Sequence, residues 1–216
     1  MNLRHILLIL FILSNLFSSV EEDVLEVANS VKKFTNTHKI PKEIFSSSQA
    51  IVIIPSYMKA SFFIGGQYGE GMVVVKKSDN SWSNPFFVKI TGGSFGIQFG
   101  LEASDTILLF RSKKSLTELL HNKITLGTEV SVSVGPIEEN YNRYKEGNFQ
   151  ADVLTYRIKD GLFIGASLDG TVLNHDIEKN SVIYGNQSKA QQIVDSELKI
   201  DIYALEELNK ILNTYK

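Results

Sequence analysis

The chain has 216 residues, of which 43% are hydrophobic and 21% are charged, and it contains no cysteine. This length fits one ordinary domain with a full hydrophobic core, and the low proline content leaves little room for long disordered tracts. The net charge of −2 argues against a nucleic-acid-binding protein, which needs a clustered basic face. The absence of cysteine excludes disulfides, thiolate metal sites and a cysteine nucleophile.

The first residues differ in character from the rest of the chain. Arg4 precedes an apolar run at 6–17, and acidic residues follow at 21–23. A membrane-spanning helix needs about 20 apolar residues, so the run indicates a signal peptide over 1–19. An uncleaved membrane anchor is the alternative. The remainder, 20–216, contains no linker or convincing repeat and is expected to form one domain.

Helical patterns occur near both ends of this domain. Apolar residues recur at helical spacing over 22–36 and again over 201–215, where Asp201 is a plausible N-cap. A short helix is expected over 113–122. The segment 137–150 is polar, contains two tyrosines, and is expected to be a long loop.

Strand patterns dominate between the terminal helices. The continuous apolar runs 50–54 and 107–110 indicate strands covered on both faces, and Pro55 is expected to stop the first. The alternation predicts an α+β fold, a curved, mainly antiparallel β-sheet flanked by N- and C-terminal helices. Four further strands are expected, each with one bulky face and one face made mostly of glycine, serine and glutamine: 61–71, 95–101, 129–135 and 161–168.

Glycine within strands is unfavourable unless something exploits its missing side chain. One explanation is curvature, because a tightly rolled sheet needs glycine at bends and where another element packs closely. The other is a shallow groove in which a ligand chain approaches the backbone. The composition favours curvature.

Catalytic and metal-binding motifs are weak. Residues 92–96 match the G-x-S-x-G nucleophile elbow, with Ser94 as the nucleophile, but that elbow needs a helix directly after it, and 95–101 alternates as a strand. The glycines of 65–71 lack the helix N-terminus that phosphate binding requires. No metal or cofactor is expected, because the histidines of the domain have no metal-ligand spacing: His38, His121 and His175.

Basic residues provide the candidate binding sites. Arg111, Lys113 and Lys114 follow a strand and open a short helix, where anionic headgroups could use both side chains and helix amides. Lys59 and Lys89 are secondary candidates on neighbouring strand ends. Each of these side chains taken alone has the character of an ordinary solvated charge.

An ordered set of short motifs runs from about 50 to 185. It includes Gly65-Gly66-x-Tyr68-Gly69-x-Gly71, then Gly92-Gly93-x-x-Gly96, and it closes with Tyr184-Gly185. Together these motifs resemble the SYLF domain family. The set carries the structural positions that we expect to fix turns and close strand approach: Gly65, Gly66, Gly69, Gly71, Trp82, Pro85, Gly92, Gly93, Gly96, Gln98, Gly100, Gly135, Pro136, Gly161, Gly165, Gly170, Tyr184 and Gly185.

The resemblance implies a domain that binds phosphoinositide or phospholipid, with actin binding and bundling in the yeast members, and it brings no catalytic residues. Eukaryotic members meet membranes through an amphipathic N-terminal segment, whereas this chain begins with a signal-like sequence. The expected function is therefore a non-catalytic module of the bacterial cell envelope that binds phospholipid or a membrane surface. Its expected location is the periplasm or outer envelope of a Gram-negative bacterium, or the medium. The alternative is an envelope structural or protein-interaction domain without a lipid ligand.

Overall fold

The structure is a computed structural model that describes residues 3–37, 39–62, 64–95, 100–121, 123–146, 151–165, 168–198, 200 and 202–214. Gly96, Gln98, His38 and Asp201, which the sequence singled out, lie outside these residues.

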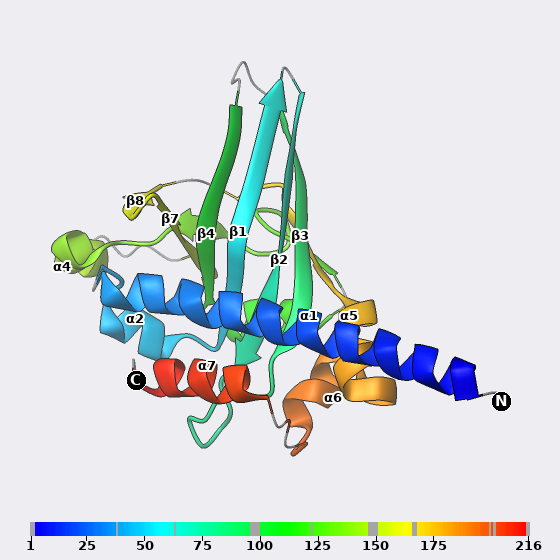
Figure 1. Ribbon diagram of the computed structural model, residues 1–216. Coiled ribbons are helices and arrows are strands. Elements are labelled where there is room, and N and C mark those ends of the chain that lie inside the picture. The colour runs from blue at the N-terminus through cyan, green and yellow to red at the C-terminus, as the bar shows by residue number, and fades with distance from the viewer. Residues whose placement is uncertain are drawn as a thin grey trace.

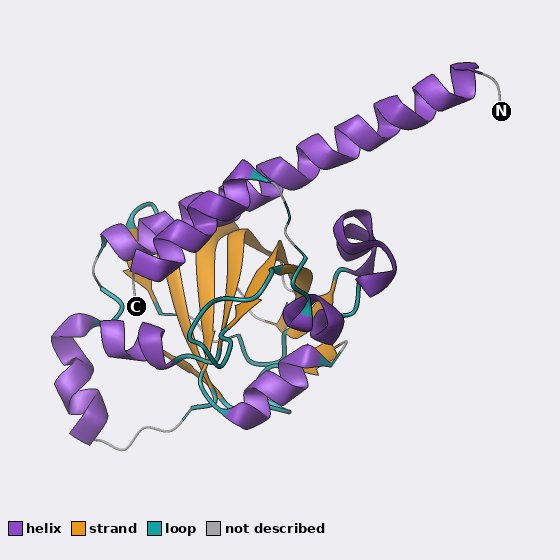
Figure 2. Ribbon diagram, turned by 90° about the horizontal axis from the view of Figure 1, so that it is seen from below, coloured by secondary structure: helices purple, strands orange, loops and turns teal. Residues whose placement is uncertain are grey.

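Helix α1, Leu3–Asn36, is continuous; it crosses one face of the sheet and extends past it at the N-terminal end (Figures 1 and 2). Its buried residues Val20, Val24, Val31 and Phe34 recur at helical spacing. The amphipathic helix predicted over 22–36 is therefore confirmed, within a longer helix. Within the part of the chain described, no helix has the length and apolarity needed to span a membrane.

The sheet is mainly antiparallel, in the order β5-β9-β3-β2-β1-β4-β7-β6, with β8 paired to β7. Only β6 and β7 pair in parallel among the named strands. The four longest strands stand side by side in the middle (Figure 1). The strands are β1 (Ala50–Phe62), β2 (Ile64–Val75), β3 (Phe86–Phe95), β4 (Gly100–Phe110), β5 (Lys123–Thr125), β6 (Val132–Val134), β7 (Val153–Lys159), β8 (Leu162–Ile164) and β9 (Val172–His175).

Helices cover both faces of the curved sheet (Figure 2). On one face α1 packs with α7 (Tyr203–Thr214) and α2 (Lys42–Ser47), and on the other lie α3 (Lys113–Leu120) and α6 (Ala190–Asp195). In β1 the side chains alternate between these two cores: Ile51 and Ile53 join the first, and Val52 and Ile54 the second. This explains the continuous apolar run and confirms the predicted α+β fold. The remaining helices are η1 (Glu138–Asn140), α4 (Tyr141–Glu146), α5 (Ile177–Tyr184) and η2 (Gly185–Gln187).

The largest difference from expectation is at Pro55, which does not stop the first strand. β1 continues to Phe62 through a bulge, where the register with β2 shifts between Ile53 and Met58. Ser56 has a φ of +51° there, a conformation that places an extra residue in the strand without ending it. The Ser56 amide donates to Asp105 Oδ1 at 3.3 Å, which satisfies a group that the bulge removes from the ladder.

Other boundaries also differ. The strand expected over 129–135 shortens to β6, which lies at the end of the sheet path. The strand expected over 161–168 begins one residue later, as β8, because Gly161 has a φ of +79° and forms a turn. β8 ends at Ile164, and residues 166–167 lie outside the described residues. The expected strand 95–101 contains the end of β3 and the start of β4, and its middle lies outside the described residues. The expected loop 137–150 contains η1 and α4, in which Tyr141 and Tyr144 stack at 6.4 Å. The helices expected over 113–122 and 201–215 are confirmed as α3 and α7.

Candidate functional site

The β1 bulge divides the central strands into a lower part under α1 and a projecting part. We call the projecting part, residues 57–62, 64–70, 89–95 and 100–104, the finger. Figure 1 shows it extending beyond the helices that cover the rest of the sheet. The bulge is fixed to α1 through Asp105, because Lys33 Nζ lies 2.5 Å from Asp105 Oδ2 while Asp105 Oδ1 accepts the Ser56 amide.

One face of the finger is open. Ala103, Met58, Tyr68 and Thr91 pair directly across the four strands, and all four are exposed, with Met58 at 43% and Tyr68 at 41%. Since strand side chains alternate, this row shares its face with Met72, which packs beneath α1. The open face therefore continues the α1-covered face of the sheet beyond the helix.

Two glycines keep the next row of the open face flat. Gly66 pairs with Gly93; both are exposed, and a Cβ added at either position would meet no atom within 4 Å. No charged residue occurs at 60–69 or at 90–101 of the sequence. The Met58–Tyr68 row and the glycine row beyond it therefore form an exposed surface without charged side chains.

The opposite face of the finger is polar and partly covered. The Tyr57 hydroxyl donates to Gln67 Oε1, and Arg157 of β7 donates to Ser104 Oγ with its Nε at 3.1 Å and its second terminal nitrogen at 2.7 Å. Its guanidinium lies 4.8 Å from the Tyr57 ring centre and 4.0 Å from the Glu102 carboxylate. Burial lowers the pKa of Arg157, and burial raises that of Tyr57 to about 12. Sequence reasoning missed Arg157, because no local pattern marks its partners.

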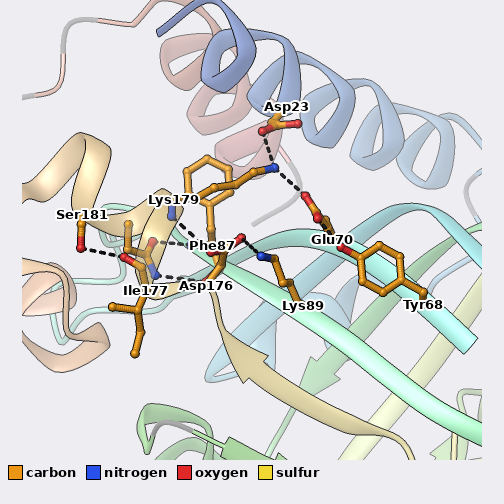
Figure 3. Close-up of polar contacts among 10 residues, drawn as sticks. Asp23, Tyr68, Glu70, Phe87, Lys89, Asp176, Ile177, Lys179 and Ser181 are labelled. Atoms are coloured by element: carbon orange, nitrogen blue, oxygen red, sulfur yellow. Dashed lines mark hydrogen bonds and ion pairs between the residues drawn. The ribbon is translucent and has the colours of Figure 1, made fainter. Parts of the chain in front are cut away.

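A second polar cluster joins α1, α5 and the finger (Figure 3). Lys179 Nζ lies 2.8 Å from Asp23 Oδ2 and 2.5 Å from Glu70 Oε2, and Lys89 forms an ion pair with buried Asp176 at 2.9 Å. Burial alone would raise the pKa of Glu70, but hydrogen bonds from Lys179 and Tyr68 outweigh it and hold that pKa below its usual value.

The same cluster shifts two further groups. Burial opposes the charge of Lys179, yet its hydrogen bonds with Asp23 and Glu70 raise its pKa overall. The hydrogen bond from Tyr68 to Glu70 raises the pKa of Tyr68 to about 12. The cluster therefore holds fixed, opposite charges at the root of the finger at neutral pH.

Two adjoining hollows separate α1 from the finger. The smaller, of about 180 Å³, is lined by Glu70, Phe87 and Lys179 together with Met58 and Tyr68 of the open face. The larger, of about 490 Å³, lies over the bulge, between the α1 lysines and Asp105. The open face thus begins at the edge of a small hollow that is polar on one side and apolar on the other.

The five predicted cations fall in two places. Lys59 and Lys89 lie on the finger strands, one residue before the uncharged segments 60–69 and 90–101 begin. Arg111, Lys113 and Lys114 lie at the opposite end of β4. Because Lys59 is in register with Glu102 and a strand rises about 3.3 Å per residue, roughly 30 Å separate Lys59 from Arg111 along the sheet.

The corner at Arg111 is partly neutralised. Arg111 donates to the Tyr144 hydroxyl at 2.8 Å and shares a hollow of about 460 Å³ with Asp152. Asp152 accepts hydrogen bonds from Ser112 and from both groups of Ser131, and the Ser112 bond is the main cause of its lowered pKa. An anion placed there would face this carboxylate.

The structural positions of the SYLF-like motifs divide into close-packed and open ones. A Cβ at Gly71 would lie 1.9 Å from the Ile53 carbonyl oxygen, and one at Gly135 would lie 2.1 Å from the Tyr156 ring. Gly69 and Gly92 are similarly crowded, whereas Gly165 has ordinary spacing and Gly66, Gly93, Gly161, Gly170 and Gly185 have open space. Close strand approach thus accounts for only part of the set.

The aromatic and proline positions of the set lie in contacts of their own. The Tyr184 hydroxyl donates to the Pro85 carbonyl at 2.5 Å, and the Tyr156 hydroxyl donates to the Pro136 carbonyl at 3.0 Å. Trp82 is buried under Lys76, whose Nζ lies 5.4 Å from the indole ring centre. Gly65 and Gly100 lie on finger strands, in register with Ser61.

The described residues contain no group of three or more acidic or histidine side chains placed to hold a metal ion. Ser94 stands near the end of β3, and the next described element after β3 is β4 rather than a helix, so the strand-turn-helix context of a nucleophile elbow is not formed. Burial lowers the pKa of His175, and its Nε2 lies 2.8 Å from the Leu119 carbonyl oxygen.

Comparison with known proteins identifies the family. Residues 91–215 match the family described as "Ysc84: Las17-binding protein actin regulator". Two relatives, "SH3 domain-containing YSC84-like protein 1" of Rattus norvegicus and of Homo sapiens, are each 27% identical to this chain over 206 residues. The matched residues make up 92% of this chain and 60% of each relative. "LAS seventeen-binding protein 3" of Saccharomyces cerevisiae is 29% identical over 165 residues, 74% of this chain and 35% of the relative.

The chain thus spans about 60% of the length of the YSC84-like relatives that it matches. The family match covers more than half of the chain, and it includes β3 from Thr91 onward, β4, the covering helices α3, α5 and α6, and the C-terminal helix α7. The resemblance read from the ordered glycine motifs is confirmed, and the chain belongs to the Ysc84 (SYLF) family.

Proposed function

We propose that this chain is a non-catalytic module that binds phospholipid membrane surfaces. The observation that carries the proposal is the open, uncharged face of the finger, where Met58 and Tyr68 are exposed beside the unobstructed glycines Gly66 and Gly93. A partner can cover an exposed surface of this kind without burying an unpaired charge, which would be costly. Membership of the Ysc84 family is consistent with a binding role.

The direct test is flotation of the purified chain with lipid vesicles. Vesicles of phosphatidylcholine alone and vesicles that also contain phosphatidylglycerol separate apolar from electrostatic binding. Flotation with both kinds supports the proposal, and stronger flotation with the anionic vesicles measures the part contributed by cations. A chain that stays at the bottom of the gradient with both kinds of vesicle contradicts it.

Among the five cations, we propose that Lys59 meets the headgroups, because it borders an uncharged segment, whereas Lys89 is already paired with buried Asp176. Lys59→Gln should weaken binding to phosphatidylglycerol vesicles about fivefold, as expected for one cation near an anionic surface, and leave binding to phosphatidylcholine unchanged. The matched control is the triple variant Arg111→Gln, Lys113→Gln, Lys114→Gln, which removes three charges at the far end of β4. Greater loss in the triple variant than in Lys59→Gln would assign the contact to the Arg111 corner.

A second candidate is a protein-interaction domain. The matched family is described as an actin regulator that binds Las17, and "LAS seventeen-binding protein 3" is among the relatives. Co-sedimentation of the chain with actin filaments in the absence of lipid would support this candidate. Failure to co-sediment, together with vesicle flotation, would leave lipid binding as the function.

We further propose that the chain is exported to a bacterial envelope and that 1–19 is removed. Val20 and Val24 of α1 are buried, so cleavage at 19 keeps both of these core residues. N-terminal sequencing of protein recovered from an envelope fraction should therefore find a start at Val20, whereas a start at Met1 would contradict the removal of 1–19. A start beyond Val24 would remove core residues and would contradict the proposed processing.

A further inference from the structure

We propose that the two adjoining hollows between α1 and the finger bind phosphoethanolamine, the zwitterion that forms the headgroup of phosphatidylethanolamine, an inference that rests on the membrane-binding function proposed above. The smaller hollow takes the ammonium group and the larger hollow takes the phosphate. Glu26, Pro55 and Ser56 line both hollows, so one ligand can occupy the two together.

The smaller hollow has an excess of negative charge. Three carboxylates line it, those of Asp23, Glu26 and Glu70, against the single cation Lys179. Lys179 pairs with Asp23 and Glu70 (Figure 3), whereas the exposed Glu26 side chain forms no ion pair with any residue that the structure describes. Asp23 and Glu26 are also like charges three residues apart on one helix, and such neighbours repel each other. A bound cation relieves this repulsion.

The wall of the smaller hollow already holds an ammonium group. Lys179 Nζ contacts two carboxylates and lies 5.7 Å from the Phe87 ring centre. Glu26, Tyr68 and Met58 line the same hollow. They offer a second ammonium group the same kinds of partner, a carboxylate and an aromatic ring, which both attract cations in proteins.

The larger hollow supplies the opposite charge. Lys32 and Lys33 line it together with Asn29 and Asn36. Lys32 is exposed and forms no ion pair within the described part of the chain. Lys33 pairs with Asp105, but its side chain is 59% exposed, and an ammonium group carries three donors. Lys33 can therefore also donate to a phosphate oxygen, as Lys32 can.

Helical spacing sets the order of these groups along α1. Glu26, Asn29 and Lys33 follow one another at intervals of three and four residues and therefore share one face of the helix. At a rise of about 1.5 Å per residue, Glu26 and Lys33 lie roughly 10 Å apart along the axis, with the amide of Asn29 between them. A ligand with an ammonium group at one end and a phosphate at the other matches this order. Phosphate alone or an amine alone uses only half of it.

Titration of the full chain with phosphoethanolamine, followed by calorimetry, tests the site without a membrane. We expect saturable binding at least about tenfold tighter than that of inorganic phosphate or of ethanolamine, because each of these occupies one hollow only. A phosphatidylethanolamine with short acyl chains, used below its micelle-forming concentration, should bind at least as tightly as phosphoethanolamine. Binding of phosphoethanolamine without binding of the short-chain lipid would overturn the headgroup assignment in favour of a free small molecule.

Two variants test the two ends of the site separately. Glu26→Gln should weaken phosphoethanolamine binding about tenfold, as expected for a lost charge-assisted hydrogen bond, and leave the binding of inorganic phosphate unchanged. Lys32→Gln should weaken the binding of both. Glu21→Gln and Lys210→Gln remove the same charges at exposed positions outside the hollows and should bind as the parent does. Parent-like binding in Glu26→Gln, or an equal loss in Glu21→Gln, would contradict the proposed site.

The outcomes separate this inference from the proposed function. If the parent floats with vesicles but binds neither phosphoethanolamine nor the short-chain lipid, the hollows are not a headgroup site, and membrane binding uses another surface. If the parent binds the short-chain lipid but does not float, the membrane-surface function fails while the headgroup site stands. Binding of ethanolamine as tight as that of phosphoethanolamine would also overturn the inference, because the smaller hollow would then recognise an ammonium group alone, such as a lysine of a protein partner.

Discussion

Gly71→Ala is expected to destabilise the protein by at least about 3 kcal/mol, at the upper end of the usual cost of overpacking. The added Cβ would lie 1.9 Å from the Ile53 carbonyl oxygen and 2.8 Å from Ile54 Cδ1. The first of these is a backbone atom just before the β1 bulge, so no side-chain rotation relieves the contact. Either the bulge or the pairing of β1 with β2 must shift.

Gly66→Ala is the matched control on the same strand. Its added Cβ meets no atom within 4 Å, so the free energy of unfolding should stay within about 0.5 kcal/mol of the parent. Denaturant unfolding of the two variants provides the comparison. Equal midpoints would mean that the bulge yields easily and does not hold the finger at a fixed angle to the rest of the sheet.

The lower half of the sheet could be predicted from the sequence because its signals are local. The run 50–54 is apolar on both faces because helices cover both faces of the sheet. The apolar residues of α1 recur at helical spacing in the sequence. The bulge could not be predicted in this way. Proline in a strand ordinarily indicates an end, and only the tertiary partner Asp105, far along the chain, shows why β1 continues through Pro55 and Ser56.

The candidate site was only partly predictable for the same reason. Glycine alternation indicated unusual strands, but it did not distinguish crowded Gly71 from open Gly66, because the difference lies in what packs above each residue. Lys59 and Lys89 were identified as surface cations, whereas Lys179 was not, since its partners Asp23 and Glu70 come from distant segments. Contacts of this kind leave no trace in local spacing.

Lys179→Met should destabilise the protein by about 2 kcal/mol at pH 7. Lys179 pairs with Asp23 and Glu70, and its Nζ lies 5.7 Å from the Phe87 ring centre. Its removal therefore leaves two half-buried carboxylates that repel each other. Breaking a fully buried pair costs about 3–5 kcal/mol. The figure is reduced here because the three side chains are 26% to 36% exposed and water screens them in part.

The dependence on pH identifies the cause. The pKa of Glu70 is lowered in the folded chain, so its contribution is present above its unfolded pKa and is lost as pH falls through the folded value. The pKa of Lys179 is raised, so its contribution is complete below its unfolded pKa and is lost as pH rises through the folded value. The difference in unfolding free energy between parent and Lys179→Met should therefore be largest at neutral pH and shrink in acid and in strong base. Lys210→Met, at an exposed position of α7, should show no such profile, and a pH-independent loss in Lys179→Met would assign the effect to packing on Phe87 instead of charge.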